Sequence, residues 1–315
     1  MRIEGRKEVL MGEKDQKAAI ETTHSALSLR FSLLIFLLME PKVNNNPKML
    51  EKQWLCTALN ARSLGLGSET IVFAHGYGTD QSVWEKIIPF FAEDYKVVLF
   101  DWPFSGAVDP NLYDPFKYSS MEAFADELVT LMDQMDLKAV TFVGHSMSGM
   151  IGSIASITRP DLFKRLILLG ASPRYLNTDD YEGGFTRSDV EQLLQDIEAN
   201  YDNWVSAFSL LAVDPSDEPS VNKFRECLRR MRANVAAPLA RTVFYSDHRD
   251  ILEKIETPCT IIQTSSDIVV PFSAAVYMES KIKGKVTLEV LDAKGHFPQL
   301  TAFLQLVDVL KGVIG

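Results

Sequence analysis

The sequence predicts an α/β fold with a mostly parallel central sheet that helices cover on both faces. Strand-like runs alternate with helix-like segments along the chain, and such alternation implies right-handed crossovers between parallel strands. The strand-like runs are apolar almost throughout, as at 95–101 and 166–171, which is typical of strands buried on both faces. The 315 residues leave room for one large domain with an inserted cap.

The first elements follow in a regular order. Apolar runs predict two strands, at 58–64 and 70–74, with a short turn between them. A short amphipathic helix at 84–91 and a buried strand at 95–101 come next. The segment 119–135 begins with serine and carries apolar residues at helical spacing, so it predicts a helix.

Residues 140–151 predict a strand, a tight turn and a helix in direct succession. The apolar run ends in small residues around one serine, Gly-His-Ser-Met-Ser at 144–148. This arrangement is typical of the nucleophile elbow of α/β-hydrolases, whose pattern is G-x-S-x-G. Glycine comes one place late, at Gly149, but serine is small enough for the turn. We therefore predict an α/β-hydrolase fold with Ser146 as the nucleophile; a chance match in a buried strand and helix is the alternative.

A serine hydroxyl is a weak nucleophile near neutral pH, so it needs a general base and an acid that orients the base. In α/β-hydrolases the chain order is Ser, Asp or Glu, then His, with both partners just past late strands. Asp267 follows the strand predicted at 260–263, and His296 follows the strand predicted at 286–291. We therefore predict a triad of Ser146, Asp267 and His296.

Only five histidines occur in the chain. His24 lies in an N-terminal extension and His248 at the end of a predicted helix, so we expect structural roles for both. His75 is expected to shape the loop after its strand rather than to titrate, and His145 to point into the core. His296 is thus the histidine in position to act as the base.

Negative charge that develops on a substrate carbonyl needs preorganised donors. The backbone N–H of Met147, at the start of the elbow helix, is one expected donor. The N–H of Tyr77 is the other, because Tyr77 follows His75-Gly76 in the loop directly after a strand. A plain tight turn is the alternative for this loop.

Between residues 172 and 257 the alternation of strands and helices stops. Four helices inserted in an α/β chain are most simply a lid over the carboxyl edge of the sheet. The core then comprises residues 51–171 and 258–315. The four lid helices are predicted, from the apolar spacing and the breaks at proline and asparagine, at 188–199, 202–213, 220–231 and 234–247.

The predicted lid is rich in aromatic residues, among them Tyr175, Trp204, Phe208 and Phe244. Aromatic residues one helical turn apart are by default core packing. If the helices cover Ser146, however, part of this aromatic face must line a cavity. Substrate pockets tend to be apolar with few polar groups, so we expect a small, largely apolar and neutral ligand.

Residues 1–50 differ from the rest, and we expect them to form a disordered or weakly helical N-terminal extension. The apolar run at 31–39 is shorter than the ~20 residues that a membrane-spanning helix needs. It has the length of a signal-peptide core, but the segment before it is long and rich in acids. A targeting segment and a docking helix are the alternatives, and Met11 or Met49 is an alternative start.

The formal net charge of −10 disfavours a nucleic-acid partner and a polybasic membrane-surface mode, since both need clustered Lys and Arg. Three cysteines without a C-x-x-C pattern indicate a reducing compartment, with no disulfide framework and no zinc site. We expect no metal and no cofactor, a monomer, and a location in the cytoplasm and nucleus.

With these residues in place, the chain from about Leu55 to its end resembles the plant strigolactone and karrikin receptor family of α/β-hydrolases. It is most similar to the branch described as dwarf-fourteen-like, the DLK type. The similarity lies in several long stretches that occur in the same order, at 74–84, 143–150, 171–177 and 241–247.

The resemblance implies a butenolide-type signalling ligand in a deep pocket under a four-helix, V-shaped lid, and slow hydrolysis by the triad. It also implies a lid that engages an F-box protein and a transcriptional repressor. The family's ligand-binding positions correspond here to Tyr77, Tyr175, Leu193, Trp204, Phe208, Val243 and Phe244.

The chain departs from the usual family pattern at several positions. Tyr77 stands where phenylalanine is usual, so its hydroxyl either narrows the pocket or binds a polar group of the ligand. Met147 replaces the commoner valine, the segment 101–107 differs, and Gln299 stands where many members have histidine. A general small-ester carboxylesterase and a noncatalytic binding protein that keeps the triad as architecture are the alternative functions.

Overall fold

The computed structural model describes residues 54–315 of the chain. The predicted N-terminal extension, residues 1–50, lies outside the described residues, so its disorder stays a prediction. Within the described part, no helix combines the length and the apolar character that crossing a bilayer requires.

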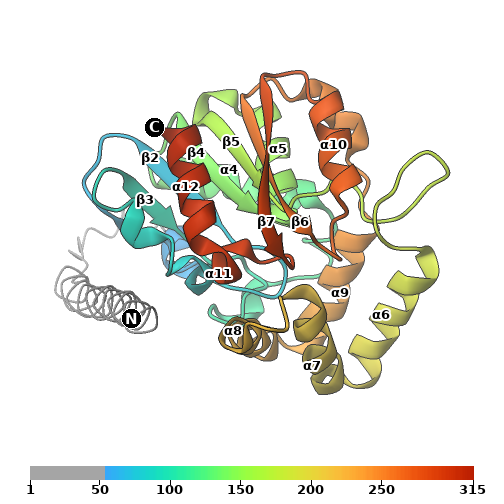
Figure 1. Cartoon of the computed structure of the whole chain (residues 1–315). Coiled ribbons are helices and arrows are strands. Elements are labelled where there is room, and N and C mark those ends of the chain that lie inside the picture. The colour runs from blue at the N-terminus through green and yellow to red at the C-terminus, as the bar shows by residue number, and fades with distance from the viewer. Residues whose placement is uncertain (1–53) are drawn as a thin grey trace, which may run out of the picture. The chain divides into compact units, whose positions relative to one another are not determined.

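Seven strands form one sheet in the order β1-β3-β2-β4-β5-β6-β7 (Figure 1). Only β1 runs antiparallel to its neighbour, and every other pair is parallel. The mostly parallel sheet predicted from the alternating pattern is confirmed. The strands span Arg62–Leu64 (β1), Thr70–Ala74 (β2), Lys96–Leu99 (β3), Val140–His145 (β4), Phe163–Leu169 (β5), Cys259–Ser266 (β6) and Val286–Lys294 (β7).

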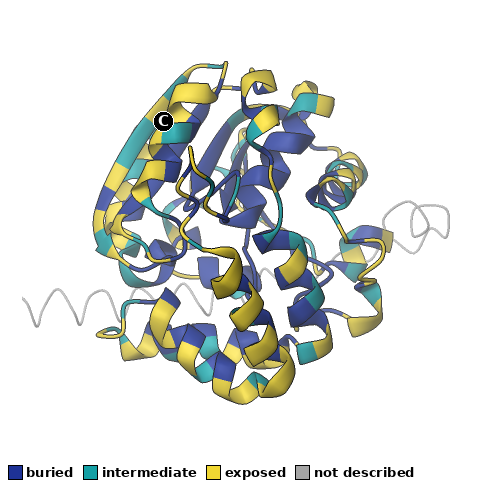
Figure 2. Cartoon of the chain, turned by 90° about the vertical axis from the view of Figure 1, so that its right-hand side faces the viewer, coloured by how far each residue is buried: buried dark blue, intermediate teal, exposed yellow. Residues whose placement is uncertain are grey.

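Helices cover both faces of the sheet, because its central strands are apolar on both sides. β4 is buried at every position, and Figure 2 shows buried strands inside a shell of helices whose outer faces are exposed. α4 (Met121–Gln134) and α5 (Met147–Thr158) pack against each other behind the sheet in Figure 1. α12 (Phe303–Ile314) lies in front of it, and α10 (Phe272–Lys281) packs on β6 and β7.

The start of the core differs from the sequence prediction. Instead of a strand over 58–64, the chain forms helix α3 (Trp54–Ala58) and then the short strand β1. Leu55 and Leu59 lie one helical turn apart and are both buried, and the Leu59 N–H donates to the Leu55 carbonyl at 2.9 Å. The spacing of this pair is that of a helix. The sequence prediction missed it because the pattern further along the segment alternates as in a strand.

The helix predicted at 84–91 is two 3-10 helices, η1 (Gln81–Trp84) and η2 (Ile88–Phe90). Pro89 in η2 has no N–H to donate, so one continuous helix would lose a hydrogen bond there. The remaining short elements are η3 (Pro110–Leu112), η4 (Pro160–Leu162), η5 (Arg249–Lys254) and α11 (Pro298–Thr301).

Four helices lie between β5 and β6, close to the predicted bounds. α6 packs on α7 and α9, and α7 packs on α8; Figure 1 shows all four beyond the carboxyl ends of the strands. Their V shape and the domain limits 51–171, 172–257 and 258–315 stay predictions. The helices span Arg187–Ala199 (α6), Tyr201–Ala212 (α7), Glu218–Arg230 (α8) and Ala233–Phe244 (α9).

Gly152 of α5 packs directly on Phe142 of β4, and an added Cβ would lie 2.4 Å from that ring. Gly152→Ala should therefore lower the free energy of unfolding by about 1–3 kcal/mol, although alanine favours the helix itself. Urea denaturation followed by circular dichroism measures this change.

Gly312→Ala in α12 is the matched control, because the added Cβ would have no atom of the described chain within 4 Å apart from its chain neighbours and the backbone of its own helix. Here only the helix preference changes, so the free energy of unfolding should rise by about 0.5–1 kcal/mol. Equal stabilities of the two variants would contradict the tight packing of α5 on β4.

Candidate active site

Loops at the carboxyl ends of four parallel strands bring the predicted site residues together. β2 leads to Tyr77, β4 to Ser146, β6 to Asp267 and β7 to His296. The carboxyl ends of parallel strands meet at one edge of a sheet, and sites of open α/β sheets form there. Residues up to 219 positions apart in the sequence therefore become neighbours, since 296 − 77 = 219.

Ser146 has the backbone of a nucleophile elbow, with φ 56° and ψ −124°. Residues other than glycine rarely adopt this conformation, and it marks stored strain at functional sites. The loop after β2 lies very close to the elbow. A Cβ at Gly76 would lie 2.9 Å from His145 Nδ1 and 3.0 Å from Ser146 Cβ, so only glycine allows this approach.

Ser148, at the variant last position of the elbow pattern, links α5 to two other segments. Its hydroxyl donates to the His75 carbonyl and accepts from Trp102 Nε1 at 2.9 Å. Trp102 Nε1 also donates to the same carbonyl at 3.0 Å. All three residues are buried, so this serine holds the loop after β2 in place, which glycine could not do.

His296 and Asp267 form a buried pair whose side chains are 5% and 1% exposed. His296 Nδ1–H donates to Asp267 Oδ2 at 2.7 Å, which leaves Nε2 free to accept a proton. The backbone N–H groups of Val269 and Val270 donate to Asp267 Oδ1 at 2.8 and 3.1 Å. Gln263 Nε2 donates to Oδ2 at 3.2 Å. The carboxylate is thus held firmly and fixes the orientation of the imidazole.

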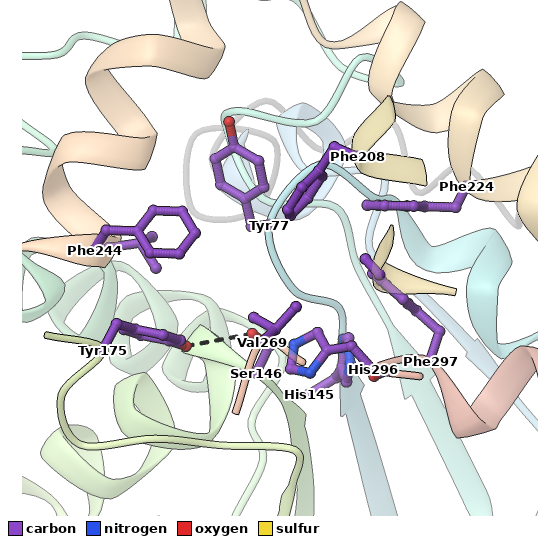
Figure 3. A pocket seen from close by; sticks show the side chains of 12 residues that line it. Tyr77, His145, Ser146, Tyr175, Phe208, Phe224, Phe244, Val269, His296 and Phe297 are labelled. Atoms are coloured by element: carbon purple, nitrogen blue, oxygen red, sulfur yellow. Dashed lines mark hydrogen bonds between the residues drawn. The ribbon is translucent and has the colours of Figure 1, made fainter. Parts of the chain in front are cut away.

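The Ser146 hydroxyl lies toward Tyr175 in this structure. The two hydroxyl oxygens are 3.4 Å apart (Figure 3), while His296 Nε2 has no hydrogen-bond partner within residues 54–315. Burial raises the pKa of Tyr175, so its hydroxyl stays neutral. Ser146 and His296 border the same cavity, and a change of the Ser146 rotamer is the movement that would direct the hydroxyl to the imidazole.

The backbone of His296 is held from two sides. Its N–H donates to the Ala212 carbonyl at the end of α7 at 2.7 Å, and its carbonyl accepts from His145 Nε2 at 2.8 Å. Burial lowers the pKa of His145 well below its usual value, so this ring is neutral and carries its proton on Nε2. His296, the predicted base, is therefore hydrogen-bonded both to the elbow and to the lid.

The two predicted oxyanion donors are available. Neither the Tyr77 N–H nor the Met147 N–H has a hydrogen-bond partner in the described part of the chain. Met147 is the first residue of α5, so its N–H is one that a helix leaves unpaired, and the helix dipole favours negative charge there. This geometry suits an oxyanion hole, and the role of both groups stays a prediction.

His75 supports the oxyanion loop as a neutral ring. Its Nε2 accepts from the Trp102 N–H at 3.0 Å, and its Nδ1 donates to the Gly76 carbonyl at 3.0 Å. Burial lowers the pKa of His75, so it shapes the loop without taking up a proton near neutral pH.

A narrow, largely apolar cavity lies between Ser146 and the lid (Figure 3). The volume of this cavity is only about 20 Å³, which is room for roughly one water molecule. Because ligand pockets usually measure ~300–1,000 Å³, this cavity must enlarge to admit a ligand. The residues that line it are Tyr77, His145, Ser146, Tyr175, Phe208, Ala212, Phe224, Val243, Phe244, Val269, His296 and Phe297.

Two of the residues predicted to bind the ligand do not line the cavity. Trp204 stacks on Phe208 with ring centroids 5.0 Å apart, and Leu193 is half-buried on α6. For both, ligand binding stays a prediction. The other five predicted positions do line it: Tyr77, Tyr175, Phe208, Val243 and Phe244.

The sequence prediction missed four lining residues besides His145. Phe297 is adjacent to the predicted base and Val269 lies two positions after Asp267, so proximity to the triad could have identified both. Ala212 and Phe224 lie on lid helices, and nothing in their spacing separates them from ordinary core packing.

Ser148→Ala should lower the free energy of unfolding by about 1–3 kcal/mol, because its hydroxyl loses two buried hydrogen bonds. It should also slow the cleavage of an aryl ester, since the loop carrying the Tyr77 N–H loses its support. Ser153→Ala is the matched control. Its hydroxyl donates only to the Gly149 carbonyl of the same helix, at 2.9 Å, so ester cleavage should not change. Urea denaturation and steady-state kinetics measure both variants, and equal kinetic losses would contradict the support role.

Comparison with known proteins agrees with this geometry. The family model described as alpha/beta hydrolase fold matches residues 69–303. Strigolactone esterase D14 of Arabidopsis thaliana is 43% identical over 254 residues, which cover 81% of this chain and 95% of that protein. Karrikin insensitive 2 receptor IA of Petunia hybrida is 41% identical, with 80% of this chain and 92% of that protein covered.

Among solved structures, a hydrolase from Oleispira antarctica matches with a TM-score of 0.80 and 29% identity, covering 84% of this chain and 97% of its own. An esterase from Exiguobacterium antarcticum, at 23% identity and a TM-score of 0.75, covers 81% of this chain and 94% of its own. This second likeness concerns the fold alone. Membership of the DLK branch stays a prediction. The chain belongs to the α/β-hydrolases, in the group that includes strigolactone esterases and karrikin receptors.

Proposed function

We propose that this chain is a serine hydrolase of ester bonds that acts as a receptor for a small butenolide-type ligand and hydrolyses it slowly. One observation carries the proposal: Ser146 and His296 line the same narrow apolar cavity, and His296 is paired with the buried Asp267. Relatives named strigolactone esterase and karrikin insensitive 2 receptor support this ligand class.

In the reaction, Ser146 Oγ attacks the ester carbonyl while His296 Nε2 takes up its proton. Asp267 keeps the imidazole oriented and stabilises its positive charge. The carbonyl oxygen becomes negative, and the N–H groups of Tyr77 and Met147 stabilise it. His296 then protonates the leaving oxygen, and a water molecule, activated by the same imidazole, hydrolyses the acyl-enzyme.

Two features favour slow turnover. The Ser146 hydroxyl must turn from Tyr175 toward His296 before attack. The cavity must also enlarge, and the backbone bond from His296 to Ala212 of α7 links the lid to the base. Movement of the lid and formation of the competent triad are therefore coupled, which suits a receptor in which ligand binding changes the lid.

A noncatalytic binding protein is the second candidate function. The observation that favours it is the orientation of the Ser146 hydroxyl, which pairs with Tyr175 and not with His296. In that case the three triad residues would only stabilise the fold, and the protein would bind a ligand in the cavity without cleaving it.

For signalling, the proposal includes a lid surface that engages an F-box protein and a transcriptional repressor. Leu210 and Leu211 of α7 support such a surface, because they are 48% and 50% exposed although large and apolar. Partners of this kind imply that the chain works in the cytoplasm and nucleus.

Ser146→Ala should abolish the burst of nitrophenol that wild-type protein releases from p-nitrophenyl acetate. Asp267→Asn should lower kcat by about 10⁴-fold, because the imidazole loses its fixed orientation. Asp292→Asn is the matched control, since Asp292 is exposed and precedes His296 by only four residues. It should leave kcat within about twofold. A full burst in Ser146→Ala would rule out the proposed nucleophile.

A butenolide ester should raise the melting temperature of Ser146→Ala, which binds the ligand without consuming it. At a ligand concentration of 100 times Kd, binding to the native state raises the free energy of unfolding by about 2.7 kcal/mol. For a domain of this size, the melting temperature should then rise by several degrees. Differential scanning fluorimetry measures the shift. No shift, combined with fast multiple turnover in the wild type, would indicate a general carboxylesterase instead of a receptor.

A further inference from the structure

We propose that Tyr77 is a specificity-determining residue that restricts access to Ser146, because its hydroxyl ties the oxyanion loop to lid helix α9. The inference rests on the proposed use of the cavity by Ser146. It decides between the two roles that the sequence allowed for this hydroxyl, narrowing the pocket or binding a polar group of the ligand.

The Tyr77 hydroxyl faces the lid backbone. It donates to the Ala236 carbonyl of α9 at 3.0 Å, and Figure 3 shows it pointing away from Ser146. Burial raises its pKa well above the usual value, so it remains a neutral donor. With its one proton engaged by Ala236, the hydroxyl cannot donate a hydrogen bond to a ligand near Ser146.

The Tyr77 ring closes the cavity. It lines the cavity wall and is only 8% exposed. Its centroid lies 6.4 Å from that of Trp204 and 6.5 Å from that of Phe244, both of the lid, in edge-to-face arrangements. A ligand larger than a water molecule must displace lining side chains, and the Tyr77 ring is one of those between Ser146 and the lid.

The loop that carries Tyr77 is packed closely on both sides. Gly76 lies against the elbow, where a Cβ would be 3.0 Å from Ser146 Cβ. Gly78, with φ +71°, packs against α8, where a Cβ would lie 2.4 Å from Leu228 Cδ2. Because the loop is packed closely on both sides, enlarging the cavity beside Tyr77 should move α9 away from this residue, which breaks the bond to Ala236.

Tyr77→Phe tests this without disturbing the catalytic groups. The variant keeps the aromatic ring and the backbone N–H, and it removes a single oxygen atom. The Ala236 carbonyl lies inside α9, so it retains its helical hydrogen bond and is not left unpaired. The variant should therefore fold.

The second-order rate constant for acylation of Tyr77→Phe by p-nitrophenyl butyrate should rise about three- to tenfold. Losing one hydrogen bond should raise the fraction of molecules whose cavity is enlarged by this factor. Stopped-flow measurement of the nitrophenol burst gives this constant. An unchanged constant overturns the proposal. A lower constant also overturns it and indicates that the hydroxyl contacts the ligand.

Tyr201→Phe is the matched control. Its hydroxyl lies within hydrogen-bond distance of the Leu228 carbonyl, at 2.5 Å, and of the Met231 carbonyl. It therefore joins α7 to the end of α8 and not to the oxyanion loop. Its acylation constant should stay within about twofold of the wild type. A rise equal to that of Tyr77→Phe would mean that any loosened lid contact has this effect, and it would overturn the specific role of Tyr77.

Two further measurements keep the outcomes separate. If the burst persists in Ser146→Ala, the proposed function fails; if it depends on Ser146 but not on the Tyr77 hydroxyl, only the access role fails. Hydrogen exchange of the α9 amides should be faster in Tyr77→Phe than in Tyr201→Phe. Equal exchange in the two variants would contradict a tie between Tyr77 and α9.

Discussion

The buried hydrogen bond from His296 Nδ1 to Asp267 Oδ2, 2.7 Å long, is the interaction on which the rest of the site depends. It selects Nε2 as the basic nitrogen, and the backbone N–H groups around Asp267 keep its carboxylate from turning away. The backbone of His296 is bonded in addition to the end of α7 and to His145. The predicted base is therefore hydrogen-bonded directly to the lid.

The fold and the grouping of Ser146, Asp267 and His296 at one edge of the sheet could be predicted, because both follow from local patterns and chain order. A strand, a turn and a helix around Ser146 imply the elbow, and the ends of two late strands then place Asp267 and His296. The first residues of the core could not be read in this way, because a single buried pair, Leu55 and Leu59, decides for a helix over a strand. Two apolar residues one helical turn apart are too few to give a clear helical pattern in the sequence.

The cavity was predictable only in part, because its walls come from packing between elements distant in the sequence. Aromatic residues of the lid were expected near Ser146, yet spacing along one helix does not separate Phe208, which lines the cavity, from Trp204, which stacks behind the lining residue. The Tyr77 hydroxyl had two possible roles, and its partner Ala236 lies 159 residues away. No local pattern could have joined them. The departure from phenylalanine at this position thus becomes interpretable only in three dimensions.

The most direct test of the account is intact-mass spectrometry of the protein after incubation with a butenolide ester, followed by peptide mapping. We expect an added mass of part of the ligand, held covalently on Ser146 or His296 in the wild type and missing from Ser146→Ala. Hydrolysis by wild-type protein with the same added mass on Ser146→Ala would contradict it, because the ligand would then be cleaved by a route that does not use the elbow serine.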